Sequence, residues 1–250
     1  MSTEARVLVP SFSDHVQELL ERVDYRLAET AEEREAIFRL RYQAYLREGA
    51  IGPSRTEMLT DHFDETDNGW VFGIYVDGHL ASSIRVHVVS KERPISPSYE
   101  VFSDLLEADL ALGKKLIDPT RFVADHEMAR RYPELPYVTV RLGFVAGEHF
   151  NAEIGIASVR AEHKAFYRRL FGLGEACEPR LGGGLVKPVY LMKIDYASVR
   201  PQILRRYPFM RSTVFERRML FQRRLETVAA DGLPTAHVLP AANDAELVTG

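Results

Sequence analysis

Residues 70–89 read WVFGIYVDGHLASSIRVHVV, and this stretch determines how the rest of the chain is interpreted. Two runs rich in β-branched and aromatic residues flank the pair Asp77-Gly78. Such a pair permits the positive φ angles that a tight hairpin turn requires at both of its central positions. The stretch therefore predicts an antiparallel β-hairpin with Arg85 in its second strand.

Strand and helix patterns alternate on both sides of this hairpin. Before it we predict a short helix over residues 12–24, a strand over 25–30 and a helix over 31–48, in which Thr30 and Glu33 form a capping box. After the hairpin come, in chain order, a partly helical stretch over 91–113, a strand over 116–124 interrupted by Pro119, a helix over 136–150, a strand over 154–160, a helix that ends at Gly172 and a strand over 186–196. This order predicts an α+β fold, in which helices flank a central mixed sheet.

The composition excludes several classes of protein. The chain has 250 residues, of which 46% are hydrophobic, which is enough to build a large core. A net charge of −4 gives no basic signature for nucleic acid, and no apolar stretch approaches the ~20 residues that a transmembrane helix needs. Cys177 is the single cysteine, so an internal disulfide is impossible. Because no signal peptide is recognisable, we expect a cytoplasmic protein.

Charge divides the chain into segments. We predict a helical extension over residues 1–24, a main domain over 25–196, and basic helices over 197–226 that pack on it. Residues 200–224 contain eight arginines and one acid. The alanine, proline and small polar residues over 227–250 are typical of a disordered tail.

Residues 61–68, DHFDETDN, place four carboxylates and one histidine together without a lysine or arginine. Like charges this close repel one another, so water, a metal ion or arginines from elsewhere must neutralise them. The segment lacks the glycine and the closing glutamate of a calcium loop, and no second histidine stands at zinc spacing. We therefore expect no metal, and a solvated loop and a charge network with arginines remain as the two interpretations.

Four short motifs resemble those of the acyl-homoserine lactone (autoinducer) synthases and the related long-chain N-acyl amino acid synthases. They are RYQAY (41–45), DHFD (61–64), Arg85 in the hairpin and DPTRF (118–122). The resemblance covers roughly residues 25–196 and implies an acyl-CoA N-acyltransferase (GNAT)-like fold with a twisted sheet. It also implies a bacterial enzyme that transfers a fatty acyl group from a thioester to an amine.

Two departures favour one of these families over the other. Autoinducer synthases have a glutamate where this chain has Leu59, and a tryptophan where it has GAIGP (49–53). Both positions concern the amino substrate in those enzymes. The sequence is therefore identified as an N-acyl amino acid synthase in preference to a lactone-forming enzyme.

The resemblance also implies roles for individual residues. Asp118 would be the general base, a backbone N–H at a bulge of the strand that contains Arg121 would hold the oxyanion, and Tyr167 would protonate the leaving thiolate. Asp61 and Asp64 would meet Arg41, Arg85 and Arg121 in space and form a charge-paired floor beside the acceptor site, to which Tyr45 would also contribute. The acyl chain would lie between the fourth and fifth strands near Phe122, Gly143 and Gly147. Each has a structural alternative: Asp118 could only fix Arg121, Tyr167 could be a core aromatic, and the glycines could allow close helix–sheet packing.

We expect no cofactor beyond the acyl thioester, which is a co-substrate. CoA-dependent members of this fold use a glycine-containing turn to hold the pyrophosphate, whereas residues 125–136, DHEMARRYPELP, contain no glycine. The pairs Arg217-Arg218 and Arg223-Arg224 would attract an acidic acyl carrier protein. The resemblance and these features predict acyl carrier protein as the donor over acyl-CoA, unless the arginines pair with acids of the same chain.

Besides the acyl-homoserine lactone synthase, two other functions stay open at this point. One is a CoA-dependent acetyltransferase that acts on a different amine. The other is an acyl-binding module that keeps the fold without turnover. Consumption of a thioester by the purified protein, with and without an amine, separates the enzymes from the module.

Overall fold

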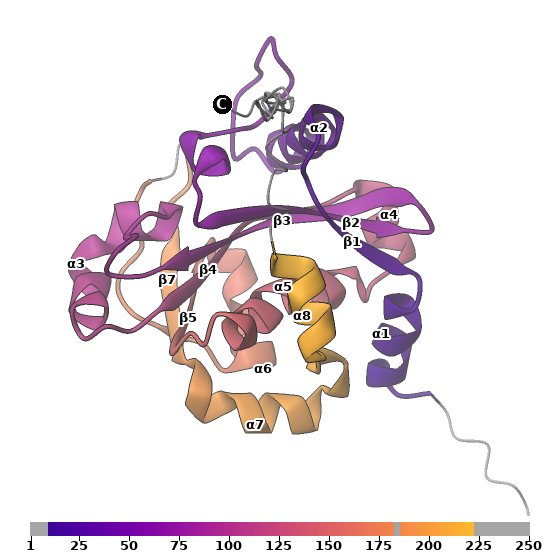
Figure 1. Ribbon diagram of the computed structural model, residues 1–250. Helices are drawn as coiled ribbons and strands as arrows, with labels where there is room; N and C mark the ends of the chain where they lie inside the picture. The colour runs from indigo at the N-terminus through magenta and orange to yellow at the C-terminus, as the bar shows by residue number, and fades with distance from the viewer. Residues whose placement is uncertain (1–9, 183–185, 223–250) are drawn as a thin grey trace, which may run out of the picture.

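The computed structural model of the protein describes residues 10–182 and 186–222. Within these ranges a seven-stranded sheet runs through the molecule in the order β1-β2-β3-β4-β5-β7-β6 (Figure 1). Neighbouring strands are antiparallel except β4 and β5, which run parallel. A search of the described helices for one that combines the length and the apolar character of a membrane span finds none.

The elements follow the predicted order. They are α1 (Phe12–Leu20), β1 (Val23–Leu27), α2 (Ala31–Arg47), the 3-10 helix η1 (His62–Glu65), β2 (Gly69–Val76), β3 (His79–Val89), α3 (Pro97–Ala111), β4 (Leu116–Ala124), α4 (His126–Arg131), α5 (Leu135–His149), β5 (Ile154–Val159), η2 (Ala161–His163), α6 (Lys164–Phe171), β6 (Gly174–Glu175), β7 (Tyr190–Asp195), α7 (Tyr196–Arg206), η3 (Pro208–Met210) and α8 (Val214–Phe221).

The hairpin and the capping box are confirmed. Asp77 and Gly78 join β2 to β3 with φ angles of 50° and 81°. At the start of α2, the Thr30 hydroxyl accepts the Glu33 amide at 3.2 Å, and the Glu33 carboxylate accepts the Thr30 amide at 3.1 Å. These local interactions set the positions from which Arg41 and Arg85 enter the interior.

Four predicted elements differ from the structure. The helix predicted over 12–24 ends at Leu20, and the strand predicted over 25–30 is β1 at Val23–Leu27, which begins inside the predicted N-terminal extension. The partly helical stretch over 91–113 contains the 15-residue helix α3, because the Ser96 hydroxyl caps it and Pro97 occupies its first turn. The last strand, predicted over 186–196, is limited to the six residues of β7. Pro188 lacks an amide donor for a sheet ladder, and the Asp195 carboxylate accepts the Ser198 amide at 2.9 Å, which starts α7.

Hydrophobic cores cover both faces of the sheet. On one face α5 packs against β3 and β4 and is itself covered by α1 and α8 (Figure 1). Its residues Leu142 and Val145 are fully buried. On the other face a separate core lies beneath α3 and includes Phe102, Leu106 and Leu116. The site described below extends from one of these faces to the other.

Strands β4 and β5 separate soon after they begin. Their pairing is limited to Leu116 with Ile154 and Ile117 with Gly155, although both strands continue beyond these residues. Past this point β4 follows β3, and β5 follows β7. The sheet is therefore split along its middle.

Strand β4 also contains a bulge. Thr120 pairs with Arg85 and Val123 with Ser83, so two residues of β4, Arg121 and Phe122, lie opposite one residue of β3. Arg121 has a φ of 52°. The sequence placed the interruption at Pro119, but Pro119 keeps its register with Val86, and the irregularity follows two residues later at the positive φ.

We predict that Gly147→Ala destabilises the fold, because a Cβ at this position would lie 2.8 Å from the Tyr196 ring. Overpacking costs about 1–3 kcal/mol, and the better helix propensity of alanine returns up to about 1 kcal/mol. We expect urea unfolding to show a net loss of about 1 kcal/mol in the free energy of unfolding. Gly52→Ala, with no atom within 4 Å, is the control and should stay within about 0.5 kcal/mol of wild type.

Replacing the obstructing ring completes this test. In a Tyr196→Leu background, Gly147→Ala should no longer destabilise and should show the gain of helix propensity. Destabilisation of the same size in both backgrounds would contradict the clash with Tyr196.

Candidate active site

The acidic stretch forms a capped 3-10 turn. The Asp61 carboxylate accepts the Phe63 amide at 3.1 Å, and the Asp64 carboxylate accepts the Asp61 amide at 3.1 Å. His87, fully buried on β3, contacts the Phe63 carbonyl through Nε2 at 3.2 Å. The turn is thus held by its own carboxylates and against the sheet, with Asp61 and Asp64 directed inward.

Three arginines meet these two carboxylates, as predicted. Arg85 Nη1 lies 2.5 Å from Asp61 Oδ1 and 2.8 Å from Asp64 Oδ1. Arg41 Nη1 lies 2.7 Å from Asp64 Oδ1, and Arg121 Nη2 lies 2.6 Å from Asp61 Oδ2. We call these five side chains the ion-pair network. Of the two interpretations of the acidic stretch, the charge network is therefore confirmed.

The other two acids of the stretch are also paired with arginine, but at the surface. Glu65 pairs with Arg34, and Asp67 pairs with Arg93. The Glu65 side chain is 73% exposed, whereas that of Asp64 is fully buried. Surface pairs contribute little to stability, so the buried pairs are the ones that constrain the site.

Burial and charge act in opposite directions on the pKa values of the network. Burial raises the pKa of Asp61 and of Asp64, but the neighbouring guanidinium groups outweigh it and hold both pKa values below their usual range. Burial lowers the pKa of Arg41 to about 10, which still leaves this side chain charged at neutral pH. The network therefore carries three positive and two negative charges.

The bulge directs Arg121 into this network. Successive side chains of a regular strand point to opposite faces, yet the Thr120 hydroxyl accepts Arg85 Nε at 3.2 Å while Arg121 binds Asp61 on the same face. The positive φ at Arg121 permits this arrangement. Arg121 also lies over the Tyr45 ring, 5.4 Å from its centroid.

Asp118 has different partners from those that were considered. Its carboxylate accepts the Ser98 amide at 3.0 Å and the Ser98 hydroxyl at 2.7 Å, while Arg121 is held by Asp61. The alternative that Asp118 fixes Arg121 is therefore wrong. Asp118 is fully buried, and burial raises its pKa, although the bonds from Ser98 and the charge of Arg85 oppose the shift.

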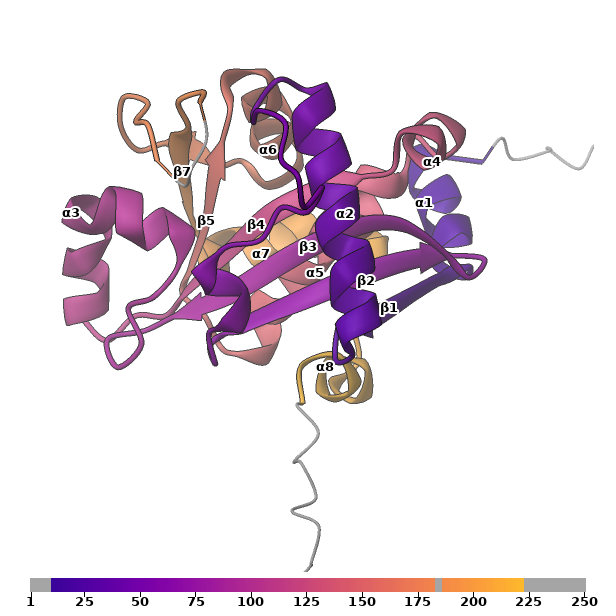
Figure 2. The same ribbon diagram turned by 90° about the horizontal axis from the view of Figure 1, so that it is seen from above.

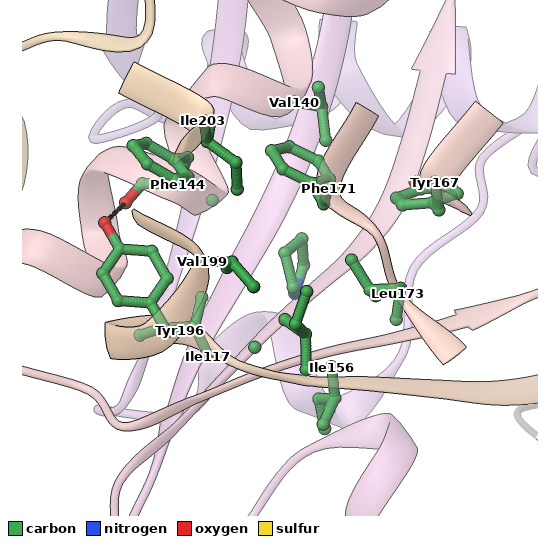
Figure 3. A pocket seen from close by; sticks show the side chains of 15 residues that line it. Ile117, Val140, Phe144, Ile156, Tyr167, Phe171, Leu173, Tyr196, Val199 and Ile203 are labelled. Carbon is green, nitrogen blue, oxygen red and sulfur yellow. Dashed lines mark hydrogen bonds between the residues drawn. The ribbon is translucent and has the colours of Figure 1, made fainter. Parts of the chain in front are cut away.

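Three neighbouring pockets, one of which shares lining residues with each of the other two, lie where β4 and β5 separate. The apolar pocket, with a cavity volume of about 50 Å³, lies on the α5 side and is lined by residues that include Gly143, Phe144, Ile156, Val199 and Ile203 (Figure 3). The charged pocket, about 70 Å³, lies on the network side and is lined by residues that include Arg85, Pro97, Thr120 and Arg121. The junction pocket, about 400 Å³, shares Pro119 and Tyr167 with the first and Tyr45, Thr120, Arg121, Ser158 and Val189 with the second.

Six of the predicted site residues line these pockets, among them Arg85 and Arg121 in the charged pocket. Tyr45, Phe122 and Tyr167 line the junction pocket, and Gly143 lines the apolar pocket. Gly147 does not, because the Tyr196 ring fills the space beside it. For Gly147 the alternative of close packing is correct, although its packing partner is α7 instead of the sheet.

The predicted carrier-docking arginines lie elsewhere. Arg217 donates to the Ser212 carbonyl at 3.0 Å and pairs with Glu148 at 3.2 Å, so it is engaged within the chain. Arg218 is exposed on α8, which packs on α5 and β1. Helix α8 lies away from α6, which carries the pocket residue Tyr167 (Figure 2). Arg223 and Arg224, and the predicted tail over 227–250, lie outside the described residues.

Two site residues have no signature in the sequence. Ser98 on α3 and Ser158 on β5 are 60 residues apart, and their hydroxyl oxygens lie 2.7 Å from each other. Ser158 lines both the charged and the junction pockets. A local motif could not have identified them, because only the packing of α3 against β5 brings them together.

Among residues 10–182 and 186–222, no group of three or more His, Cys, Asp or Glu side chains is arranged to hold a metal ion.

Comparison with known proteins identifies related chains. The family described as N-acyl amino acid synthase FeeM matches residues 36–195. The solved structure of FeeM, an N-acyl amino acid synthase from uncultured soil microbes, superposes with a TM-score of 0.62 at 20% identity, covering 76% of this chain and 99% of FeeM. No curated protein matches.

Two further structures share the fold. TofI, solved in a ternary complex with an inhibitor and MTA, gives a TM-score of 0.52 at 17% identity, covering 76% of this chain and all of TofI. BjaI, a CoA-dependent acyl-homoserine lactone synthase solved with SAM and isopentyl-CoA, gives a TM-score of 0.52 at 13% identity. The superposition covers 75% of this chain and 89% of BjaI. These likenesses confirm the predicted GNAT-like fold.

We predict that Asp64→Asn destabilises the protein by about 3–5 kcal/mol at pH 7, because it leaves Arg41 and Arg85 buried with one carboxylate fewer. The folded pKa of Asp64 lies below its unfolded value of about 3.9, so its stabilising contribution is complete above that value and is lost as the pH falls through the folded pKa. The difference in the free energy of unfolding between variant and wild type should therefore become smaller below about pH 4. Urea unfolding of both proteins at pH 7, 4 and 3 measures this difference.

Glu65→Gln is the matched control, because it removes a neighbouring carboxylate that is exposed and paired with Arg34. Its effect at pH 7 should be much smaller than that of Asp64→Asn. A gap for Asp64→Asn that stays constant down to pH 3 would show that the carboxylate charge is not what stabilises the fold.

Proposed function

Because this chain belongs to the FeeM family of N-acyl amino acid synthases, we propose that it joins a long-chain fatty acyl group to the amine of an amino acid. Family membership makes the chain an N-acyltransferase, and the proposal adds the nature of the two substrates. One observation carries the proposal: where β4 and β5 separate, an apolar pocket and a charged pocket each share lining residues with the junction pocket.

The apolar pocket favours a hydrocarbon chain. Its lining comes from both strands and from α5, α6 and α7, and the side chains labelled in Figure 3 are aliphatic or aromatic. The Tyr196 hydroxyl donates to the Phe144 carbonyl at 2.8 Å, so its polar atom is occupied. An acetyl group would leave this pocket empty, which supports a longer acyl group over an acetyl group.

The charged pocket favours an acceptor that carries a carboxylate. Arg85 and Arg121 line it, and the ion-pair network behind them has one more guanidinium than carboxylates. Such an excess of positive charge in a poorly solvated site attracts an anion. A free amino acid presents a carboxylate to the network while its amine points toward the junction pocket.

In the proposed reaction the thioester would lie in the junction pocket. The amine nitrogen attacks the thioester carbonyl carbon, the C–N bond forms, and the C–S bond breaks to release a thiolate. The bulge at Arg121 and Phe122 is the place where a backbone amide would stabilise the oxyanion. Asp118 remains the proposed final proton acceptor, although it is not among the described residues that line these pockets.

Tyr167 is placed to assist the leaving group. It lines both the apolar and the junction pockets, and burial raises its pKa above the ordinary value. The phenol is therefore protonated at neutral pH and can donate a hydrogen bond to the sulfur. Complete transfer of its proton to a thiolate of pKa about 8.5 would be uphill, so we assign it a hydrogen-bonding role.

The starts of α4 and α5, which follow β4, do not favour a CoA pyrophosphate site. The Asp125 carboxylate caps α4 by accepting the Met128 amide at 3.0 Å, which puts a negative charge where an anion would bind. At the start of α5, the Leu135 and Tyr137 amides donate to carbonyls of the same chain at 3.0 and 2.9 Å, and Pro136 has no amide hydrogen. These features support acyl carrier protein as the donor.

The mouth of the junction pocket gives the carrier a place to approach. Glu48 and His163, which are both exposed, and Arg160 line this pocket, and Arg160 pairs with Glu48. Arg217 is engaged by Glu148 and α8 contributes no residue to the described pockets, so among the described residues of the predicted docking set a steering role would rest on the exposed Arg218.

The product itself tests the proposed function. We expect the purified protein, given a lauroyl thioester and the twenty amino acids, to form N-lauroyl amino acids detectable by mass spectrometry. Thioester consumption without any amino acid product would contradict the amino acid acceptor, and faster use of acetyl-CoA would favour an acetyltransferase.

Val199→Phe should shift the same reaction toward shorter acyl groups, because the larger ring fills the apolar pocket. Displacing three or four methylenes at about 0.8 kcal/mol each predicts a loss of roughly 50- to 200-fold in kcat/KM for lauroyl. The butyryl thioester should keep its kcat/KM. Equal losses for both chain lengths would place the acyl chain elsewhere.

The donor prediction compares one acyl group on two carriers. We expect a higher kcat/KM for lauroyl-acyl carrier protein than for lauroyl-CoA at low ionic strength. The advantage should shrink as salt increases, because screening shortens the range of charge steering from ~8 Å at 0.15 M to ~3 Å at 1 M. Equal or better use of lauroyl-CoA, or a preference that salt leaves unchanged, would overturn it.

A further inference from the structure

A line of three side chains connects a buried carboxylate to the pockets. Asp118 on β4 is fully buried, and its Oδ1 accepts the Ser98 hydroxyl at 2.7 Å. Ser98, also fully buried, lies on α3, and its Oγ is 2.7 Å from Ser158 Oγ on β5. Ser158 is partly exposed and lines the charged and junction pockets. Of these three side chains, Ser158 is therefore the one that a bound substrate can contact.

The hydrogen bonds along this line have one direction. A serine hydroxyl carries a single proton, and an ionised carboxylate can only accept. Because Ser98 donates its proton to Asp118, Ser158 must be the donor in the bond between the two hydroxyls. The remaining lone pairs of Ser158 Oγ are then available to accept a hydrogen bond from the pocket side, which is what an ammonium group needs.

We propose that Ser158 receives the proton of the acceptor's ammonium group and that Ser98 passes a proton on to Asp118, an inference that rests on the proposed function. The ammonium group gives one proton to Ser158 Oγ, Ser158 gives its own to Ser98 Oγ, and Ser98 gives its own to the Asp118 carboxylate. The neutral amine then attacks the thioester. Its second proton goes to the departing thiolate, so that an amide, a thiol and a protonated Asp118 result.

Capping of α3 alone does not account for this arrangement. The Ser98 amide, which donates to Asp118 at 3.0 Å, is sufficient to join the start of α3 to β4. The hydroxyl of Ser158 adds nothing to that cap, yet it extends the line by one step to the lining of the charged and junction pockets. Its position is explained by contact with a substrate.

The surroundings of Asp118 suit a proton acceptor. Burial raises its pKa, and the hydrogen bonds of Ser98 and Ser96 and the charge of Arg85 limit the rise. His87 is its register partner on β3 and is neutral at neutral pH, because burial lowers its pKa to about 3. The described hydrogen bonds from α3 to Asp118 come from the amide and the hydroxyl of Ser98, and Ser158 on β5 bonds to Ser98. A carboxylate with a raised pKa accepts a proton more readily than an ordinary aspartate.

The test uses Ser158→Ala and measures lauroyl thioester consumption with the twenty amino acids at pH 6, 7 and 9. Without the line of hydroxyls the enzyme must capture amine that is already neutral in solution. With an α-amine pKa of about 8, we expect Ser158→Ala to be roughly 100-fold slower than wild type at pH 6, roughly 10-fold at pH 7 and nearly equal at pH 9. Ser158→Thr keeps a hydroxyl and should recover most of the rate at pH 6.

Two further variants complete the comparison. Ser98→Ala interrupts the line one step further from the pocket and should show the same dependence on pH. Ser83→Ala is the matched control, because Ser83 is a buried serine on β3 whose hydroxyl makes no hydrogen bond to another described residue. It should follow wild type at every pH.

The outcomes separate the two proposals. A wild type that consumes no thioester with amino acids contradicts the proposed function, and the proton path with it. An active wild type with Ser158→Ala equally active at pH 6 contradicts the path alone. A loss for Ser158→Ala of the same size at pH 6 and pH 9 also overturns it, because that result describes a structural role for the hydroxyl.

Discussion

Arg121 has a left-handed backbone conformation in the middle of β4, and the site depends on it. Its φ of 52° costs a residue with a Cβ roughly 1–3 kcal/mol. In return, Thr120 and Arg121 reach the same face, where one accepts from Arg85 and the other binds Asp61. A regular strand would point Arg121 to the α5 side, into the apolar core, and the ion-pair network would lose its connection to the pockets.

The network also joins local structure to tertiary structure. Asp61 and Asp64 each cap the 3-10 turn η1 and bind arginines with the same carboxylate. Burying ion pairs brings little net stability, since desolvation offsets the attraction, and apolar replacements are often as stable. The presence of five charged side chains in the interior, at the edge of a pocket that Arg85 and Arg121 line, therefore supports a role in substrate binding more than a role in holding the fold.

The split between β4 and β5 brings opposite chemistries within reach of each other. The two strands pair at two positions and then separate, and the apolar pocket on the α5 side and the charged pocket on the other side each share lining residues with the junction pocket. A hydrocarbon chain and a polar acceptor can each remain in a suitable environment while their reacting atoms meet. Tyr167 and Ser158 lie at the two sides of this junction.

The sequence by itself determined the elements whose causes are local. Asp77-Gly78 set the hairpin and Thr30 with Glu33 set the start of α2, because turn and cap preferences depend on a few neighbouring residues. Motif resemblance also indicated that Arg41, Arg85 and Arg121 would meet Asp61 and Asp64. Only the tertiary structure decided that the bulge lies at Arg121 and not at Pro119, that Tyr196 fills the space beside Gly147, and that Ser98 and Ser158 extend Asp118 toward the pockets. These features depend on contacts between elements distant along the chain, and no spacing of residues within one element records which side chains packing will bring together.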